Sequence, residues 1–282
     1  MLLTETYKNY KGDYKMEKYK IPTLTIAGSD SSGGAGIQAD LKTFSAIGTY
    51  GMSVITAITA QSTQGVFLVE DLSKEIIKKQ IEVVFDDIPP KAVKIGMVSS
   101  PEIIRVIVDT LGKYNPKNLV VDPVMISKSG YSLLKPEAKE NLVKYLIPKA
   151  YILTPNTLEA EEIAGIKINN LDDMKLVGEK ILALGPDYVL MKGGHLDGDA
   201  VDVLIGKDTF EIYKSERLDM KNTHGTGCTL SSAITAYLAL GLDVKEAILE
   251  AKKYITNAIK YSFDIGKGVG PVHHFYKFDL NK

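Results

Sequence analysis

A regular alternation of strand-like and helix-like segments constrains the fold of this chain more than any other feature. Short apolar, β-branched runs occupy residues 23–27, 53–58, 92–95, 119–121, 151–153 and 188–191. Apolar residues at helical spacing follow several of these runs, at 37–47, 76–85 and 103–111. Strands that alternate with helices form mainly parallel sheets covered on both faces. We therefore predict an α/β protein with three layers, a sheet between two layers of helices.

The chain is expected to form one domain. Its 282 residues suffice for one large α/β domain or two small ones, and no linker-like stretch divides them. We assign residues 21–282 to this domain, with two antiparallel edge strands near 201–204 and 210–213. Residues 1–20 are rich in Tyr and Lys and lack periodicity, so we expect a loosely ordered tail. Met16, within that tail, is an alternative start of translation.

Composition narrows the function classes. The formal net charge is −1 and basic residues are dispersed, which argues against a nucleic-acid partner. The single cysteine, Cys228, excludes an internal disulfide and a thiolate metal cluster, and it suits a reducing cytoplasm. No apolar run has the length of a membrane span, so no membrane partner is expected. We expect a cytoplasmic protein that forms a homodimer.

Polar and glycine residues gather directly after the predicted strands. They are Gly28-Ser29-Asp30, Gly96-Met97, Asp122-Pro123, Asn156 and Lys192-Gly193-Gly194. In an open parallel sheet, ligands bind in the crevice beyond the carboxyl ends of the strands. Residues from across the whole sequence are therefore expected to meet in one site.

The segment Gly225-Thr226-Gly227-Cys228 leads directly into a long apolar helical pattern. A glycine turn at a helix start aims unpaired backbone N–H groups at one point, where the helix dipole adds positive charge. Such a point binds anions, and phosphate is the first candidate. A thiol placed there is expected to ionise more easily than usual. The alternatives are a plain turn and a buried, unreactive cysteine.

Two carboxylates are candidates for a magnesium site. Asn156 and Glu159 open a helix, so both fit a helix cap, and Asp122 before Pro123 fits a simple turn. The functional alternative is that Glu159 and Asn156, joined by Asp122, hold Mg²⁺ through waters beside a triphosphate. Magnesium keeps several of its waters and needs few protein carboxylates.

The remaining motifs suggest a small substrate beside a nucleotide. The glycine-rich segment 28–36 lacks the order of a dinucleotide fingerprint, and no Walker-type run occurs in the chain. This segment is expected to cover a substrate, or else to be a turn. Lys192, followed by Gly193 and Gly194, has the chemistry to meet phosphate oxygens, or else is solvated. The Gln61 amide matches a heteroaromatic edge that offers both an acceptor and an amino group, or else lies on a surface loop.

Together these motifs resemble the hydroxymethylpyrimidine/phosphomethylpyrimidine kinases of thiamine synthesis. The resemblance rests on residues 25–42, Lys94-Ile95-Gly96-Met97, 121–125, Thr154-Pro155-Asn156 with Glu159, Lys192-Gly193-Gly194-His195 and 225–229. These motifs occur in the family's order, and the match runs from about residue 21 to about residue 273. The N-terminal extension departs from the family, and nothing carries over to it.

This resemblance implies a ribokinase-like fold and two ATP- and Mg²⁺-dependent phosphorylations, first of 4-amino-5-hydroxymethyl-2-methylpyrimidine and then of its monophosphate. By position, it implies a pyrimidine pocket lined by Gly28, Asp40, Gln61, Met97, Val124 and Cys228. It implies a nucleotide and metal side formed by Asn156, Glu159 and Lys192. Many relatives in the wider superfamily carry an aspartate, as catalytic base, where this chain has Cys228.

Two other functions stay open from the sequence. A pyridoxal kinase on the same scaffold is one, and Gln61 argues against it because its amide suits an aminopyrimidine better than a hydroxypyridine. A non-catalytic vitamin-binding or regulatory protein is the other. That function predicts a damaged anion loop or metal cluster, and the sequence shows neither.

Overall fold

The computed structural model describes residues 18–126, 130–131, 133–193 and 200–280. The strands in these ranges form one nine-stranded sheet in the order β3-β2-β1-β4-β5-β6-β7-β8-β9. Their bounds are β1 Pro22–Asp30, β2 Tyr50–Ser62, β3 Gly65–Asp71, β4 Ala92–Ile95, β5 Leu119–Val121, β6 Ile152–Leu153, β7 Tyr188–Lys192, β8 Ala200–Gly206 and β9 Thr209–Ser215. The six central strands, β2, β1, β4, β5, β6 and β7, pair in parallel. The edge strands β3, β8 and β9 pair antiparallel. The mainly parallel sheet and the antiparallel β8–β9 edge confirm the prediction.

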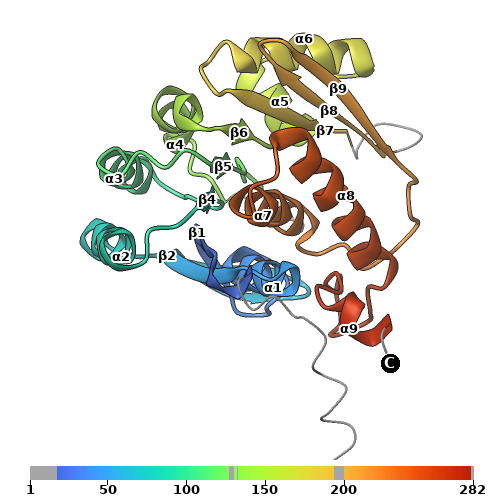
Figure 1. Ribbon diagram of the computed structural model, residues 1–282, viewed down its shortest axis with the longest axis horizontal. Helices are drawn as coiled ribbons and strands as arrows, with labels where there is room; N and C mark the ends of the chain where they lie inside the picture. The colour runs from blue at the N-terminus through green and yellow to red at the C-terminus, as the bar shows by residue number, and fades with distance from the viewer. Residues whose placement is uncertain (1–17, 127–129, 132, 194–199, 281–282) are drawn as a thin grey trace, which may run out of the picture.

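Helices cover both faces of the sheet, which gives the three predicted layers (Figure 1). One layer holds α1 Gly36–Ile47, α7 Thr226–Ala239 and α8 Val244–Lys260. The other holds α2 Lys74–Asp87, α3 Pro101–Leu111, α4 Ala138–Asn141, α5 Thr157–Ala164 and α6 Leu171–Leu182. Single helical turns lie at Lys18–Lys20, Leu142–Leu146 and Ile147–Lys149, and α9 is Tyr276–Leu280. Each layer has its own apolar core against the sheet.

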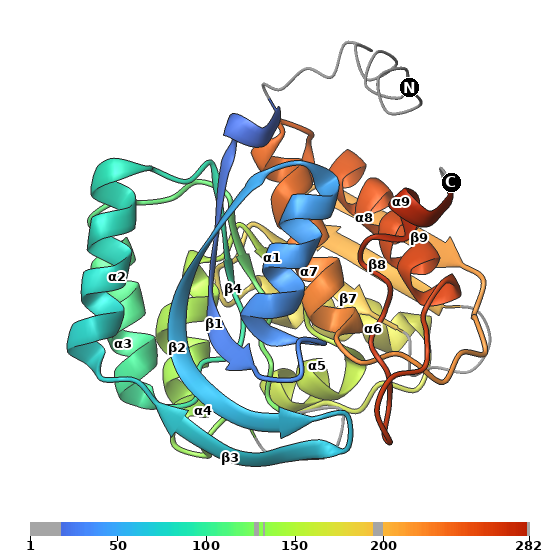
Figure 2. The same ribbon diagram turned by 90° about the horizontal axis from the view of Figure 1, so that it is seen from below.

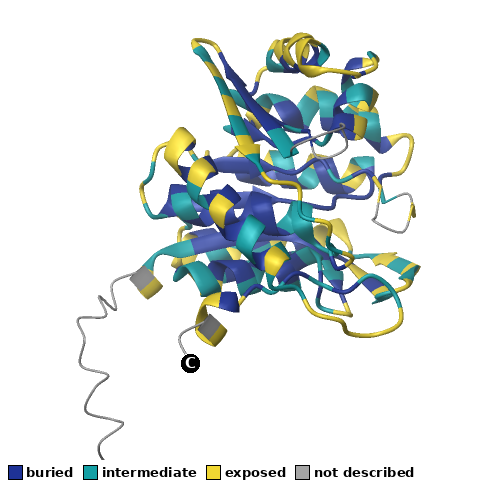
Figure 3. Ribbon diagram, turned by 90° about the vertical axis from the view of Figure 1, so that its right-hand side faces the viewer, coloured by how far each residue is buried: buried dark blue, intermediate teal, exposed yellow. Residues whose placement is uncertain are grey.

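The helix α7 is the central element of its layer. It packs against α1, α8 and three strands of the sheet, and most of its residues are buried. A helix that is apolar nearly all round belongs in such an interior position. The colouring by exposure in Figure 3 shows buried residues through the centre and exposed ones on the outer helix surfaces. The start of α7 is thereby held rigidly at the end of the sheet where the parallel strands stop.

The structure corrects two details of the sequence analysis. Gly28-Ser29-Asp30 does not follow its strand but forms the last part of β1, because pairing with β2 continues past a register shift between Ala27 and Ser29. Such a bulge bends the strand end and redirects its side chains. The strand β3 was not predicted; with β2 it forms a hairpin that curves across one end of the molecule (Figure 2).

Local sequence signals fix several helix ends. Ser73, Ser100, Asn156 and Asp243 each accept a hydrogen bond from a backbone N–H of the first helical turn that follows. These caps satisfy N–H groups that have no carbonyl partner within the helix. In the part of the chain that the structure describes, no helix is long and apolar enough to cross a bilayer. The predicted tail lies almost entirely outside the described residues, Met16 included.

Candidate active site

A cavity of about 1050 Å³ lies at the carboxyl ends of the parallel strands. It brings together most of the residues singled out from the sequence. Its lining includes Gly28, Gln61, Met97, Asp122, Val124, Asn156, Glu159, Lys192, Gly225, Thr226, Gly227 and Cys228. These residues come from segments spread over some 200 positions of the chain, so the topology of the sheet assembles the site as expected.

The start of α7, where the sequence analysis expects an anion to bind, borders this cavity. Gly225 precedes the helix with φ 81°, a left-handed conformation that favours glycine. The first intrahelical bond runs from Thr229 N–H to Gly225 O, so the N–H groups of Gly227 and Cys228 have no carbonyl four residues back in the helix. A Cβ placed on Gly227 would lie 3.6 Å from Lys192 Nζ. The helix start and a lysine ammonium therefore face the same small space.

Asp122 and Lys192 form a salt bridge at this space. Lys192 Nζ donates to Asp122 Oδ1 over 3.0 Å, and the hydroxyls of Thr154 and Ser231 also lie within 3.2 Å of the same carboxylate. Burial alone would raise the pKa of Asp122, but Lys192 and Lys94 hold it below its ordinary value. The carboxylate is therefore ionised, although it is only 2% exposed.

Glu159 is the second carboxylate beside Lys192. Its Oε2 accepts from Asn156 N–H over 2.8 Å, and Asn156 Oδ1 accepts from Glu159 N–H over 2.9 Å. This reciprocal pair is a capping box, so the expectation of a cap is confirmed. Burial raises the pKa of Glu159 to about 7; Lys192 opposes this rise and the charge of Asp122 adds to it. A helix cap formed by Glu159 does not require another carboxylate, that of Asp122, so close to it.

The two carboxylates fit a magnesium ion. Asp122 and Glu159 both lie beside the Lys192 ammonium, and the charge of Asp122 raises the pKa of Glu159, so a further cation near the pair would favour both ionised carboxylates. The described residues contain no group of three or more His, Cys, Asp or Glu side chains that would hold a metal ion by themselves. Mg²⁺ matches this sparse set of oxygen donors, because it retains waters and binds phosphate oxygens as well.

Cys228 stands in the first turn of α7, partly exposed to the cavity. The expectation that its thiol ionises easily is wrong for the ligand-free site. Burial raises the pKa of Cys228 to about 11; Lys94 lowers it, and the charges of Asp40 and Asp122 raise it further. The helix dipole does not overcome the low polarity around the sulfur and two nearby carboxylates.

Gly28, Met97 and Gln61, which the sequence analysis expects to contact the substrate, also line the cavity. A Cβ on Gly28 would lie 3.1 Å from Met97 Sδ, so the missing side chain lets the sulfur reach the floor of the cavity. The Gln61 amide lies 3.2 Å from Thr59 Oγ1 and 3.3 Å from His224 Nε2. Gln61 is thus at the end of β2 and held in place, not on a free surface loop.

Two sequence-derived site residues lie outside the cavity lining. Asp40 is fully buried, and its carboxylate accepts from Thr25, Lys94 and Ser232. It is not among the residues that line the cavity. Gly193 also lies outside the lining: its N–H donates to Asp202, and a Cβ there would lie 2.1 Å from Val201 O. Gly194, with His195, lies outside the described residues.

The sequence analysis missed a connection between Asp30 and His224. The His224 Nε2 atom lies 3.0 Å from Asp30 Oδ2, and both residues line the cavity. The only signal for His224 was its position next to Gly225. Asp30 was noted only as one of several polar residues after a strand.

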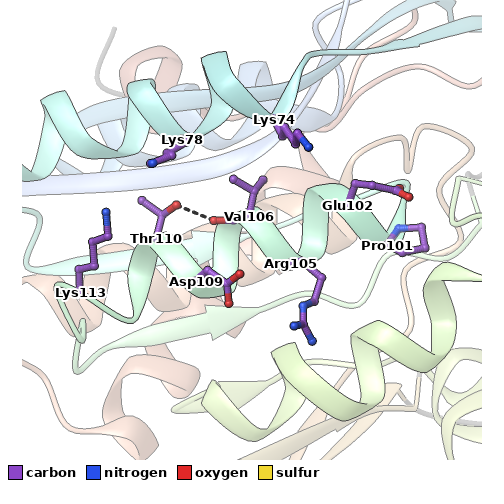
Figure 4. A pocket seen from close by; sticks show the side chains of 9 residues that line it. All are labelled: Lys74, Lys78, Pro101, Glu102, Arg105, Val106, Asp109, Thr110 and Lys113. Atoms are coloured by element: carbon purple, nitrogen blue, oxygen red, sulfur yellow. Dashed lines mark hydrogen bonds between the residues drawn. The ribbon is translucent and has the colours of Figure 1, made fainter.

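A second hollow, of about 470 Å³, lies between α2 and α3, away from the strand ends (Figure 4). Charged side chains dominate its lining, including Lys74, Lys78 and Arg105. Thr110 there only bonds back to Val106 O within its own helix. No glycine lies among the residues that line this groove, so the larger cavity is the better candidate site.

Known proteins match the chain over nearly its whole length. The phosphomethylpyrimidine kinase family matches residues 30–273. A hydroxymethylpyrimidine/phosphomethylpyrimidine kinase from Rhizobium meliloti is 51% identical over 259 residues, covering 90% of this chain and 97% of the relative.

Solved structures match as well. A phosphomethylpyrimidine kinase from Clostridium difficile is 76% identical, with a TM-score of 0.78 over 85% of this chain and 99% of that chain. An ADP complex of Bacillus subtilis pyridoxal kinase is 44% identical, with a TM-score of 0.84 over 90% of this chain and 97% of that chain. The ribokinase-like fold implied by the resemblance is confirmed.

Proposed function

This chain belongs to the phosphomethylpyrimidine kinase family, and we propose that the cavity of about 1050 Å³ is the site of its reaction. The protein is a hydroxymethylpyrimidine and phosphomethylpyrimidine kinase of thiamine biosynthesis. The observation that carries the assignment of the site is the start of α7: its N–H groups, Lys192 and Asp122 all border the space next to Gly227. This arrangement binds and stabilises a phosphoryl group.

The acceptor lies on the side formed by β1, β2 and the loop after β4. Gly28, Gln61, Met97 and Val124 surround the pyrimidine ring in this proposal. The Gln61 amide keeps one N–H and one oxygen lone pair for the aminopyrimidine edge after its contacts with Thr59 and His224. The ring is thereby oriented with its hydroxymethyl group toward Cys228.

The nucleotide lies on the side formed by Asn156 and Lys192. Kinases of this kind act mainly by positioning and by charge stabilisation in the transition state. The N–H groups at Gly225–Cys228 and the Lys192 ammonium neutralise the phosphoryl group during transfer. The relative from Bacillus subtilis that binds ADP supports ATP as the donor.

Asp122 and Glu159 would hold Mg²⁺ beside the phosphates. When bound, the ion neutralises phosphate charge that the protein alone leaves uncompensated. The chain's own residues then have separate tasks. Lys192 binds phosphate, and the capping box fixes Glu159 in place.

Cys228 is the candidate acceptor for the proton of the substrate hydroxyl. Lys94 and the Gly36 backbone both lower the pKa of this thiol. Because the ligand-free thiol is protonated at neutral pH, it must first release its own proton to solvent before it can accept the substrate proton. A loose transition state for phosphoryl transfer needs little help from a base.

One assay tests the assignment. The purified protein is incubated with ATP and Mg²⁺ and, separately, with the pyrimidine alcohol, its monophosphate and pyridoxal. Phosphorylation of both pyrimidines, with pyridoxal the poorer acceptor, is expected from the Gln61 amide. Turnover of pyridoxal alone would contradict the proposal.

We also propose that the protein forms a homodimer through the β2–β3 hairpin. β3 is an edge strand whose Phe67 and Leu68 are 69% and 64% exposed, and Ile58 of β2 is 51% exposed. An edge strand with exposed apolar residues is a template for pairing with another chain. Light scattering should give a dimer for the wild type and a monomer for Phe67→Asp. A monomeric wild type would exclude this interface.

The single domain over residues 21–282 and the cytoplasmic location both stay predictions. Limited proteolysis that leaves residues 21–282 as one resistant fragment would support the first. Fractionation of cells would test the second.

A further inference from the structure

Two segments that are far apart in the sequence lie against each other along one side of the cavity. The first is the loop 30–36 between β1 and α1, and the second is 224–228 at the start of α7. Asp30 pairs with His224 over 3.0 Å, and the Gly36 backbone lies close enough to Cys228 to lower the pKa of its thiol. The contact therefore runs from the beginning to the end of both segments.

Asp30 is the centre of the first segment. Its Oδ1 accepts from Ser32 N–H over 2.8 Å, and its Oδ2 accepts from the N–H groups of Gly34 and Ala35 over 3.0 and 2.8 Å. Burial alone would raise the pKa of Asp30, but hydrogen bonds from His224 and from this loop lower it to about 2. An ionised carboxylate only accepts, so His224 Nε2 carries the hydrogen between them.

Missing side chains allow the two segments to approach this closely. A Cβ on Gly34 would lie 2.2 Å from His224 Cδ2. A Cβ on Gly225 would lie 1.8 Å from Gly34 O, and Gly225 also needs its positive φ. Both glycines are thus required for the imidazole ring to reach Asp30 across the loop.

The backbone of His224 is held by the segment at Gly270 and Pro271. Its N–H donates to Gly270 O over 3.0 Å, and it forms an isolated parallel bridge with Pro271. The His224 side chain therefore connects the C-terminal part of the chain to the loop 30–36.

The same ring nitrogen lies 3.3 Å from the Gln61 amide. Because that nitrogen donates its one hydrogen to Asp30, it makes no second full hydrogen bond with the amide. His224 therefore lies against Gln61 as well as holding the loop in position. Neither the anion-binding role of the glycine turn nor the role of Cys228 accounts for this histidine.

We propose that His224 is a positioning residue for the phosphoryl transfer. By donating to Asp30 it clamps the loop 30–36 onto the segment 224–228, and it so holds the acceptor side of the cavity against the anion-binding side. This inference rests on the proposed function, because the cavity must bind an alcohol on one side and a phosphoryl group on the other.

The experiment compares His224→Leu, which cannot donate, with His224→Gln, whose amide N–H replaces the ring N–H. The first readout is hydrogen exchange of the backbone amides at 31–36 in the ligand-free protein. The second is kcat and KM for the pyrimidine alcohol. Loss of a charge-assisted hydrogen bond should lower kcat/KM of His224→Leu by roughly 10- to 100-fold, with faster exchange at 31–36. His224→Gln should recover most of both losses.

His273→Leu serves as the matched control. The His273 Nε2 atom lies 2.6 Å from Asp279, so the same ring-to-alkyl change removes a histidine–aspartate contact away from the cavity. It should leave exchange at 31–36 and kcat/KM at wild-type values.

Two results with His224→Leu would overturn the inference. One is hydrogen exchange at residues 31–36 that is as slow as in the wild type. The other is faster exchange at these residues while kcat/KM stays at the wild-type value. If His224→Leu does not fold, failure of His224→Gln to retain wild-type exchange and turnover would also overturn it. A wild-type protein that phosphorylates no pyrimidine would instead refute the proposed function, and the exchange comparison would still decide whether the clamp exists.

Discussion

The Lys94 ammonium lies 2.6 Å from the Asp40 carboxylate, and neither side chain is exposed to solvent. The carboxylate also accepts from Thr25 and Ser232, over 2.7 and 2.6 Å. Burial would lower the pKa of Lys94, but the charges of Asp40 and Asp122 raise it above its ordinary value. A charged lysine is thus among the residues that line the cavity.

Lys94→Met should destabilise the protein strongly. Removing one partner of a buried ion pair leaves an uncompensated charge, at a typical cost of about 3–5 kcal/mol. Urea unfolding measures this loss, and Lys94→Met combined with Asp40→Asn should recover part of it. Lys113→Met is the control, since the Lys113 contact with Glu82 at 3.1 Å is an exposed pair and should matter little. Equal effects of the two single substitutions would refute this account of Lys94.

Glu159 should make the ligand-free protein less stable as the pH rises. Its folded pKa of about 7 lies above the ordinary value of 4.5, so the folded state holds a proton that the unfolded state has lost. The free energy of unfolding therefore falls between pH 4.5 and pH 7, by on the order of 3 kcal/mol. Glu159→Gln keeps an acceptor for the cap and should remove this dependence, as measured by urea unfolding at several pH values.

The same substitution separates the cap from the metal site. Glu159→Gln should lower turnover and shift the Mg²⁺ titration to higher concentrations, because one carboxylate is gone. If Glu159 were only a cap, the change would be confined to stability, at about 1 kcal/mol or less. An unchanged Mg²⁺ titration curve would favour the cap alone.

Local sequence patterns predicted much of the sheet. Contacts between residues far apart in the sequence could not be predicted in this way. Strands β4 and β5 have the predicted bounds because short buried runs with clear ends define them. The pairing of Asp40 with Lys94, 54 positions away, was not predicted, because no local pattern reveals it. The link between Asp30 and His224 spans 194 positions and was missed for the same reason.

Gly227→Ala tests the anion-binding space. The added Cβ would lie 3.6 Å from Lys192 Nζ and 3.8 Å from Asp122 Oδ2, which are ordinary contacts, so the fold should be retained. Alanine also favours a helix over glycine, which offsets any loss of stability. The methyl group would occupy the space next to the N–H groups, so kcat/KM for ATP should fall by at least about 10-fold. Wild-type kinetics in a folded Gly227→Ala protein would show that phosphate binds elsewhere.

The last prediction concerns the role of Cys228. With a pKa of about 11, its thiol should react slowly with iodoacetamide at pH 7 and faster as the pH rises toward that value. Bound pyrimidine should protect it. A reaction that is fast at pH 7 and independent of pH would contradict the raised pKa.

Turnover of Cys228→Ser and Cys228→Ala then decides between a base and a pocket wall. A general base contributes about 10²–10⁴-fold, so Cys228→Ala should lose kcat on that scale while KM for the pyrimidine changes less. Cys228→Ser should lose less, because its hydroxyl oxygen keeps a hydrogen-bond acceptor in the position of the sulfur. If both variants retain kcat within about threefold, far below the range of a general base, Cys228 only shapes the pocket. The proton of the substrate hydroxyl would then leave without its help, as a loose transition state permits.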